Sequence, residues 1–115
     1  MSARNKYRTG EQPRELAPIF AALGDETRLL LISRLCNDGP MSITRLPYGT
    51  NVTRQAITKH LEVMRKAGLV RNTRRGRERI WQLERRRLKE ARHCLELISK
   101  QWEDALGRLK KFVEE

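Results

Sequence analysis

Hydroxyl, amide and basic side chains gather at the start of a predicted helix spanning about residues 53–68. Arg54, Gln55, Thr58 and Lys59 fall on the exposed side of its first turns, and each can hydrogen-bond to a base edge or a phosphate. A short helix with such groups on its first turns fits the major groove of DNA. Taken alone, the segment is described equally well as an ordinary amphipathic surface helix, so its neighbours decide between the two interpretations.

This segment also carries the signals of a helix with defined ends and a buried side. Thr53 can cap its start through a side-chain oxygen, and Gly68 can adopt the left-handed backbone that often follows a helix. Its apolar residues recur at steps of three and four, which predicts one buried stripe: Ala56, Ile57, Leu61, Met64 and Ala67.

The overall charge favours a polyanionic partner. Lys and Arg number 25 against 14 Asp and Glu, which gives a net charge of +11 on 115 residues. Such an excess predicts attraction to nucleic acid first and to a membrane surface second. The sequence shows no long apolar run or lipidation signal, so we expect no membrane partner. The N-terminus lacks the apolar core of a signal peptide, so we expect a cytoplasmic protein.

Three segments are expected along the chain: a flexible arm of residues 1–12, one domain of residues 13–84, and a C-terminal helix within residues 85–115. Pro13 can begin a first helix, and Asp25 can cap a second after a break at Gly24. The expected buried residues are Leu16, Ile19, Phe20 and Leu23 on the first helix, and Leu29, Leu31, Ile32 and Leu35 on the second.

A third, shorter helix is expected from Ser42 to Leu46, ended by residues 47–49. The helix at residues 53–68 follows after a brief loop. Two helices joined by a tight turn, the second one capped and basic at its start, make a helix-turn-helix.

Two β-prone runs come next, residues 69–73 and 79–83, joined by Arg74-Arg75-Gly76-Arg77. A hairpin with arginines at its end has the layout of a wing, and these arginines would lie near phosphates or enter a minor groove. A solvated basic loop is the plainer interpretation, but a bare hairpin with only arginines at its tip has little structural reason to exist. The expected fold is therefore mainly α with a small β-hairpin, a winged helix-turn-helix of about five helices and a two-stranded wing.

The last segment carries an apolar seam on one side of a long helix. Eight apolar residues alternate at steps of three and four: Leu88, Ala91, Leu95, Ile98, Trp102, Ala105, Leu109 and Phe112. A helix of residues 86–114 would be roughly 43 Å long, which is more than a domain this small can cover. We therefore expect a homodimer rather than a helix packed wholly on its own core. A two-fold dimer would place two recognition helices on successive major-groove faces, so its operator should be an inverted repeat.

Several segments resemble a known family. Residues 20–29 (FAALGDETRL) resemble the opening signature of ArsR-type winged-helix repressors. Residues 53–61 (TRQAITKHL) are similar to that family's recognition helix, and residues 67–70 (AGLV) to its lead into the wing. Residues 76–83 (GRERIWQL) and 101–106 (QWEDAL) resemble a subgroup whose members often have a neighbouring gene for a START-like (SRPBCC) ligand-binding protein.

The resemblance covers about residues 16–113 and implies a dimeric DNA-binding repressor whose first and last helices form the dimer interface. Together with the residue patterns, it gives two sets of candidates. Those for DNA contact are Ser42, Thr53, Arg54, Gln55, Thr58, Lys59, His60, Arg74, Arg75 and Arg77. Those for the dimer interface are Leu16, Phe20, Leu95, Ile98, Trp102, Leu109 and Phe112.

Metal sensing and catalysis are not expected. Metal-sensing members of the family carry a cysteine pair in the helix before the recognition helix, where this chain has Ser42 and Thr44, and hydroxyls are poor ligands for soft metals. Glu90, His93 and Cys94 do not reproduce the alternative site on the last helix. The sequence has no Gly-rich phosphate loop, paired catalytic carboxylates or triad signature, so we expect neither an enzyme nor a cofactor.

The isolated thiols and the histidine have plain interpretations. Cys36 is expected to be a small core residue, and Cys94 to lie near a dimer contact. A redox switch through either is a further hypothesis, based on the nearby cations Arg34 and Arg92. His60 is expected either to pack inside the protein or to touch a phosphate.

The sequence thus predicts a sequence-specific DNA-binding transcriptional regulator, a homodimeric repressor on an inverted repeat in double-stranded DNA. The alternative is a non-specific basic winged-helix protein that binds DNA or RNA, because overall charge does not separate the two. A scaffold for a protein partner, whose charge only keeps it soluble, is a third interpretation. No effector is assigned from the sequence.

Overall fold

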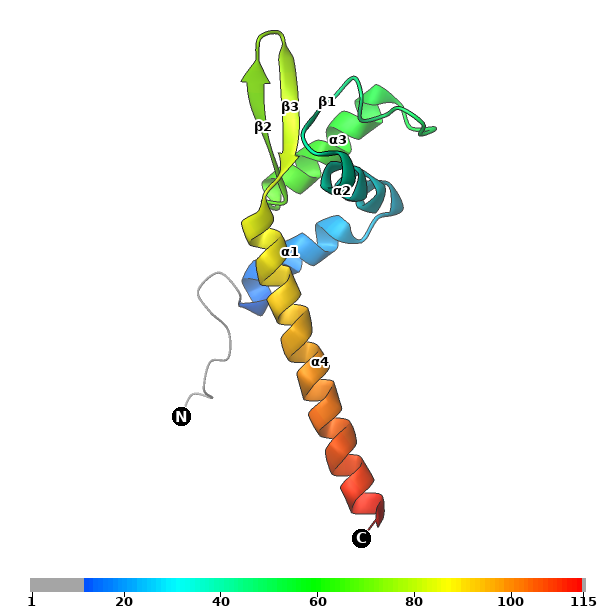
Figure 1. The fold of residues 1–115 in the computed structure, drawn as a ribbon, viewed down its shortest axis with the longest axis vertical. Coiled ribbons are helices and arrows are strands. Elements are labelled where there is room, and N and C mark those ends of the chain that lie inside the picture. The colour runs from blue at the N-terminus through cyan, green and yellow to red at the C-terminus, as the bar shows by residue number, and fades with distance from the viewer. Residues whose placement is uncertain (1–11, 115) are drawn as a thin grey trace.

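The computed structural model describes residues 12–114, which form four helices and one small sheet (Figure 1). The mainly helical fold with a β-hairpin is therefore confirmed, while the predicted arm lies, apart from Gln12, outside the described residues. No helix within residues 12–114 is long and apolar enough to cross a membrane. In chain order the elements are α1 (Pro13–Leu23), α2 (Glu26–Asp38), β1 (Met41–Ser42), α3 (Arg54–Lys66), β2 (Val70–Arg75), β3 (Glu78–Leu83) and α4 (Arg85–Glu114).

The first helix begins and ends, and the second begins, where the sequence predicts. Pro13 is the first residue of α1, and Gly24 follows its last turn. Asp25 caps α2, since its Oδ2 accepts a hydrogen bond from the backbone N–H of Arg28 at 3.0 Å. One expectation for the buried side is wrong: Leu29 is 52% exposed, while Leu31, Ile32 and Leu35 are buried. A helix turns 100° per residue, so Leu29 lies too far round to share their stripe.

The predicted helix from Ser42 to Leu46 is also wrong, and the described residues therefore hold four helices rather than about five. Met41 and Ser42 instead form β1, which pairs with β3 through Trp81 and Ile80. Extended pairing is incompatible with helical dihedrals, so only one helical turn follows, closed by Leu46 N–H donating to the Ser42 carbonyl at 3.2 Å.

Turns and bends occupy residues 43–52, and two side chains hold them in place. Arg34 of α2 donates from its guanidinium to the carbonyl of Leu46 at 2.6 Å. The hydroxyl of Thr50 donates to the carbonyl of Pro47 at 2.7 Å. The segment leading into α3 is therefore anchored although it is not helical.

The sheet is antiparallel with the order β1-β3-β2. Its hairpin turns over only two residues, Gly76 and Arg77, because Arg75 still pairs with Glu78. Gly76 has φ 64°, the left-handed backbone that such a tight turn requires at its first position. The strands therefore run further into the arginine segment than the sequence indicates, and Arg74 belongs to β2 rather than to the loop.

The core lies where α1, α2 and α3 meet, and α1 also packs against the first part of α4. Ile57, Leu61 and Met64 of α3 are fully buried, as the predicted stripe requires. Each fully buried side chain of this size contributes about 1.5–3 kcal/mol to stability. This packing fixes the rotation of α3 about its axis and hence the side that α3 presents to solvent.

Of the two cysteines, one lies where the sequence did not predict it. Cys36 is exposed, although it was expected in the core, and Cys94 is buried in the core of its own chain. Ala91 and Cys94 are the buried residues of α4, and both belong to its first third. The rest of α4 extends away from the other elements (Figure 1).

Candidate nucleic-acid interface

The start of α3 presents a cluster of exposed polar side chains. Arg54, Gln55, Thr58 and Lys59 are all exposed, and Thr53 immediately before them is exposed as well. Because Ile57 is fully buried between them, these side chains are directed outward by the packing of the helix itself. Five groups capable of hydrogen bonding thus lie within two helical turns.

The two threonines of this cluster each use one hydrogen-bonding function inside the helix. Thr53 Oγ1 accepts from the backbone N–H of Ala56 at 3.1 Å, which is the predicted N-cap. Thr58 Oγ1 donates to the carbonyl of Arg54 at 3.0 Å. A hydroxyl both donates and accepts, so Thr53 keeps its proton for an acceptor such as a phosphate oxygen, and Thr58 keeps its oxygen for a donor such as a base amino group.

The end of α3 is closed by the glycine that the sequence indicates. Gly68 has φ 80°, its N–H donates to the carbonyl of Arg65 at 3.0 Å, and the N–H of Leu69 donates to the carbonyl of Met64 at 2.9 Å. This pair of bonds satisfies carbonyls that the helix leaves free and turns the chain directly into β2. The wing therefore starts at a fixed angle from α3.

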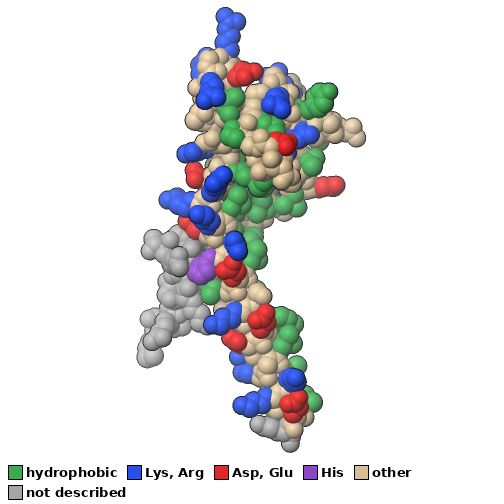
Figure 2. Space-filling view, viewed as in Figure 1, with side chains coloured by type: hydrophobic (Ala, Val, Ile, Leu, Met, Phe, Trp, Pro, Cys, Tyr) green, Lys and Arg blue, Asp and Glu red, His purple; other side chains and the backbone are tan. Residues whose placement is uncertain are grey.

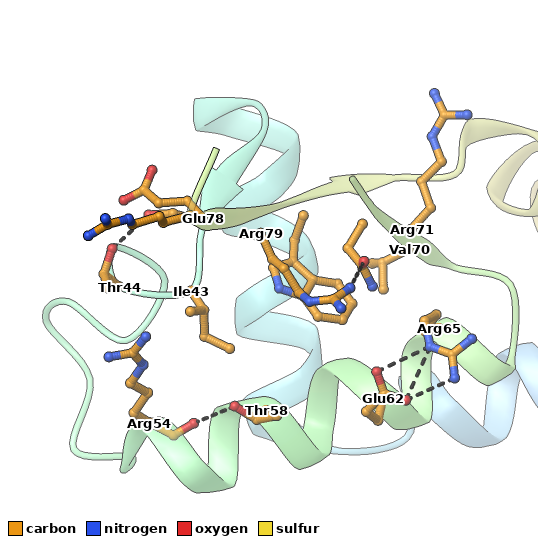
Figure 3. Close-up of a pocket in the computed structure, with 14 residues that line it drawn as sticks. Ile43, Thr44, Arg54, Thr58, Glu62, Arg65, Val70, Arg71, Glu78 and Arg79 are labelled. Carbon is orange, nitrogen blue, oxygen red and sulfur yellow. Dashed lines mark hydrogen bonds and ion pairs between the residues drawn. The ribbon is translucent and has the colours of Figure 1, made fainter. Parts of the chain in front are cut away.

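The wing has two faces that differ in their surroundings. The register pairs Asn72 with Trp81 and Arg74 with Arg79, and cross-strand partners point to the same side of a sheet. Trp81 is buried, so this face is directed toward the body of the protein. Arg71, Thr73 and Arg75 alternate with these residues and belong to the opposite face. Figure 3 shows Arg71 extending away from α3 and Arg79 lying on the α3 side of the strands.

A groove of about 940 Å³ separates α3 from the wing. Its lining is polar and mainly cationic (Figure 3): Arg54, Arg65, Arg77 and Arg79 are set against two carboxylates, Glu62 and Glu78, while Arg71 borders the groove with a side chain that extends away from α3. Lysine and arginine side chains also gather over the wing end of the molecule, as the space-filling view shows (Figure 2). A groove of this charge between a helix and a hairpin suits a strand of phosphates.

Several arginines of the wing and the groove already form hydrogen bonds within the chain. Arg79 donates from its guanidinium to Asn72 Oδ1 at 2.7 Å, and Arg74 Nε donates to the carbonyl of Gly76 at 3.2 Å. On the α3 side of the groove, Arg65 forms an ion pair with Glu62 at 2.9 Å. The hydrogen bonds from Arg65, together with the charges of Arg65, Lys66 and Arg79, keep the pKa of Glu62 below its ordinary value.

Two predicted DNA contacts already have interaction partners within the chain. Ser42 lines the groove from β1 but is only 6% exposed, and its Oγ lies 2.8 Å from Thr44 Oγ1, so its contact with DNA stays a prediction. His60 Nδ1 lies 3.2 Å from the guanidinium of Arg28 and 3.9 Å from Asp25 Oδ2. His60 thus faces α2 and joins α3 to that helix.

Arg28 is the centre of that connection. Its Nε donates to the carbonyl of Ala22 at 2.5 Å, while its backbone N–H donates to Asp25. The N–H of Arg28, and then the charges of Arg28 and His60, lower the pKa of Asp25. One arginine therefore links the end of α1, the start of α2 and the middle of α3.

Sequence reasoning did not name as DNA contacts several polar residues that line the groove: Thr44, Glu62, Arg65, Arg71, Asn72, Glu78 and Arg79. A signal was available for Arg79, because its place opposite Arg74 follows from a two-residue turn. No comparable signal marks Thr44, which reaches the groove only because residues 43–52 are turns.

The predicted dimer residues fall into two groups. Leu16 is fully buried in its own chain and Phe20 is half-buried. Leu95, Ile98, Trp102, Leu109 and Phe112 are 50% to 77% exposed along α4. Figure 2 shows hydrophobic side chains along one side of this helix, beyond the body of the protein. Within residues 12–114 no group of three metal-ligating side chains could hold a metal ion.

Comparison with known proteins points the same way as the geometry. A family model described as a helix-turn-helix domain matches residues 23–73. The chain is 41% identical over 68 residues to the HTH-type transcriptional regulator YuzN of Bacillus subtilis, covering 54% of this chain and 74% of the relative. It is 30% identical over 80 residues to an HTH-type transcriptional regulator of Methanocaldococcus jannaschii, covering 70% of this chain and 90% of the relative.

A solved structure is similar over most of the chain. It is that of an ArsR-like transcriptional regulator from Rhodococcus sp. RHA1, with a TM-score of 0.74 and 35% sequence identity. The similarity covers 86% of this chain and 92% of that one.

Proposed function

This chain belongs to the ArsR-type helix-turn-helix transcriptional regulators, and from that premise we propose that it is a homodimeric repressor that binds an inverted-repeat operator. Its relatives are transcriptional regulators rather than enzymes, and this chain is likewise a transcriptional regulator and not an enzyme. The observation that carries the proposal is the exposed cluster Arg54, Gln55, Thr58 and Lys59 beside a cationic groove and an arginine-bearing wing.

The position of each residue on α3 and the wing indicates which part of the DNA it would contact. Gln55 and Lys59 lie on the side of α3 opposite the buried Ile57 and Leu61, so they would enter the major groove most deeply. Arg54 lies on the side toward the wing and would meet the phosphates at the edge of that groove. The wing tip would then contact the backbone or the adjacent minor groove through Arg75 and Arg77.

The exposed seam of α4 supports the homodimer. Apolar side chains as large as Trp102 and Phe112 are 64% and 77% exposed, and a soluble monomer rarely leaves a continuous apolar face in water. A second copy is the partner that the seam implies, because a two-fold axis places identical faces against each other. Repression follows if such a dimer lies across a promoter and occupies DNA that the polymerase needs.

Competition binding tests the proposal. A labelled duplex from the region upstream of the chain's own gene is bound, and unlabelled random duplex and single-stranded RNA are added as competitors. We expect the unlabelled upstream duplex to displace the label at a concentration at least about a thousandfold lower than random duplex, since specific sites are typically that much tighter. Equal competition by all three would instead favour the non-specific binder that the net charge of +11 alone suggests.

A further inference from the structure

Glu62 is a carboxylate in a groove that otherwise suits an anion. It lies on α3 four residues after Thr58 and eight after Arg54, so the three side chains follow one side of the helix along the groove. The other carboxylate of the lining, Glu78, lies at the wing tip in the pair with Arg75. Glu62 is therefore the acidic group on the helix side of the groove.

Arg65 grips Glu62 with three hydrogen bonds. Its Nε donates to both carboxylate oxygens at 3.1 Å, and its second guanidinium nitrogen donates to Oε2 at 2.9 Å (Figure 3). The two side chains remain 43% to 44% exposed. A guanidinium group binds a carboxylate and a phosphate with the same forked geometry. Arg65 therefore already has the orientation in which it could bind a phosphate, and Glu62 occupies the place that the phosphate would take.

Arg79 faces the same carboxylate from the wing. Its charge contributes to the lowered pKa of Glu62, and both residues line the groove from opposite sides. Glu62 thus partly neutralises one arginine on each wall of the groove. Phosphates that enter must replace it as the partner of Arg65 and share Arg79 with it.

We propose that Glu62 takes the place of a DNA phosphate in the free protein and thereby restrains the part of DNA binding that does not depend on sequence. The proposal rests on the proposed function, since it presumes that the groove accepts DNA. Replacing Glu62 by a phosphate as the partner of Arg65 reduces the binding free energy by the same amount for every DNA sequence. Only sites that also offer base contacts to the start of α3 then bind tightly enough to be occupied.

The Glu62→Gln variant tests this, with two labelled duplexes of unrelated sequence as probes. The amide keeps the shape of the side chain and removes the charge, so Arg65 becomes available to a phosphate. We expect the affinity for both duplexes to rise by the same factor, roughly three- to tenfold, and the salt slope to steepen by about one unit. Unchanged affinity and slope would overturn the proposal, and so would a change confined to one sequence, because Glu62 would then be a base contact.

Glu96→Gln is the matched control. Arg92 Nε donates to Glu96 at 2.9 Å on the exposed surface of α4, outside the groove, so this variant removes one arginine-paired carboxylate elsewhere. We expect it to leave both affinities and the slope unchanged. An equal rise would show that net charge alone is responsible and would overturn the proposal.

An Arg65→Ala background completes the test. If Glu62 acts by occupying Arg65, the gain from Glu62→Gln should fall by more than half in this background, and a gain of undiminished size would overturn the proposal. If the unaltered protein shows no salt-dependent affinity for any duplex, the proposed function itself fails. That result is distinct from normal binding with an inert Glu62→Gln variant, which refutes only the role of Glu62.

Discussion

At the residue scale, identical side-chain types in α3 have different roles because their surroundings differ. Thr53 caps the helix, while Thr58 bonds back to the carbonyl of Arg54. Arg54 is exposed at the edge of the groove, whereas Arg65 is already occupied by Glu62. The sequence predicts the exposed polar cluster well, because its polar residues alternate with a buried stripe. It does not predict that Arg65 pairs with Glu62 on α3, nor that Arg79 of the wing lines the same groove.

Gln55→Ala tests base reading by a single residue. An amide at this position can form two hydrogen bonds with an adenine, so its loss should cost about 1–3 kcal/mol at one operator position and relax the preference there. The measurement is equilibrium binding to a set of operators that differ at single base pairs. Equal weakening on every member of the set would make Gln55 a phosphate contact.

Asp25→Asn tests the capping cluster that joins α2 to α3. The pKa of Asp25 is lowered by the backbone N–H of Arg28 and by the charges of Arg28 and His60. A carboxyl with a depressed folded-state pKa stabilises the fold above its unfolded-state pKa, and this contribution disappears as the pH falls through the folded-state value. The melting temperature of the unaltered protein should therefore exceed that of Asp25→Asn at pH 6, and the difference should shrink below about pH 4.

Glu26→Gln is the control for that experiment, because Glu26 is exposed in the same first turn. Its effect on the melting temperature should be small at pH 6. A difference between the unaltered protein and Asp25→Asn that stays constant down to pH 3 would contradict the assigned role of the carboxylate.

At the scale of elements, local signals predict the helices that begin with a cap and end with a glycine. Asp25, Thr53, Gly24 and Gly68 all bound helices as expected. The helix predicted at residues 42–46 is wrong because a long-range interaction determines the structure of this segment. Ser42 pairs with Ile80, a residue nearly forty positions later, and no local pattern reports that pairing. The same strand pairing leaves Ser42 largely buried at the edge of the groove.

The wing gives a prediction at this scale. Arg75→Ala and Arg77→Ala should each lower the affinity for all duplexes and reduce the salt slope by about one unit, because each removes one phosphate contact. Arg108→Ala is the control, since it removes the same charge from the exposed distal part of α4. Titrations at several salt concentrations provide the slopes. An equal loss in Arg108→Ala would mean that overall charge, rather than the wing, attracts the DNA.

At the scale of the whole molecule, residues 12–114 leave most of the C-terminal helix α4 uncovered. The chain measures 66 × 32 × 20 Å, and the long dimension follows α4. The heptad spacing predicts both this helix and its apolar side. What the spacing does not show is where intramolecular packing stops: Ala91 and Cys94 are buried, whereas Leu95 is already 54% exposed. That boundary depends on the position of α1, which a periodic pattern does not encode.

Trp102→Glu tests the seam. A carboxylate without a partner in an apolar interface costs several kcal/mol, so the dissociation constant of the dimer should rise at least about a hundredfold. Sedimentation equilibrium measures it. Lys100→Glu, on the opposite side of the same helix turn, should leave the dimer intact. A Trp102→Glu protein that remains dimeric would show that the seam does not join the two copies.

Selection of bound sequences from a random duplex library tests the central claim most directly, because it requires the reading helix, the wing and the dimer at once. The account predicts enrichment of one inverted repeat, with half-site centres about 10 base pairs or a multiple of that apart. It also predicts that Trp102→Glu loses this enrichment while still binding the library weakly. A library that remains unenriched after selection with the unaltered protein would contradict the account.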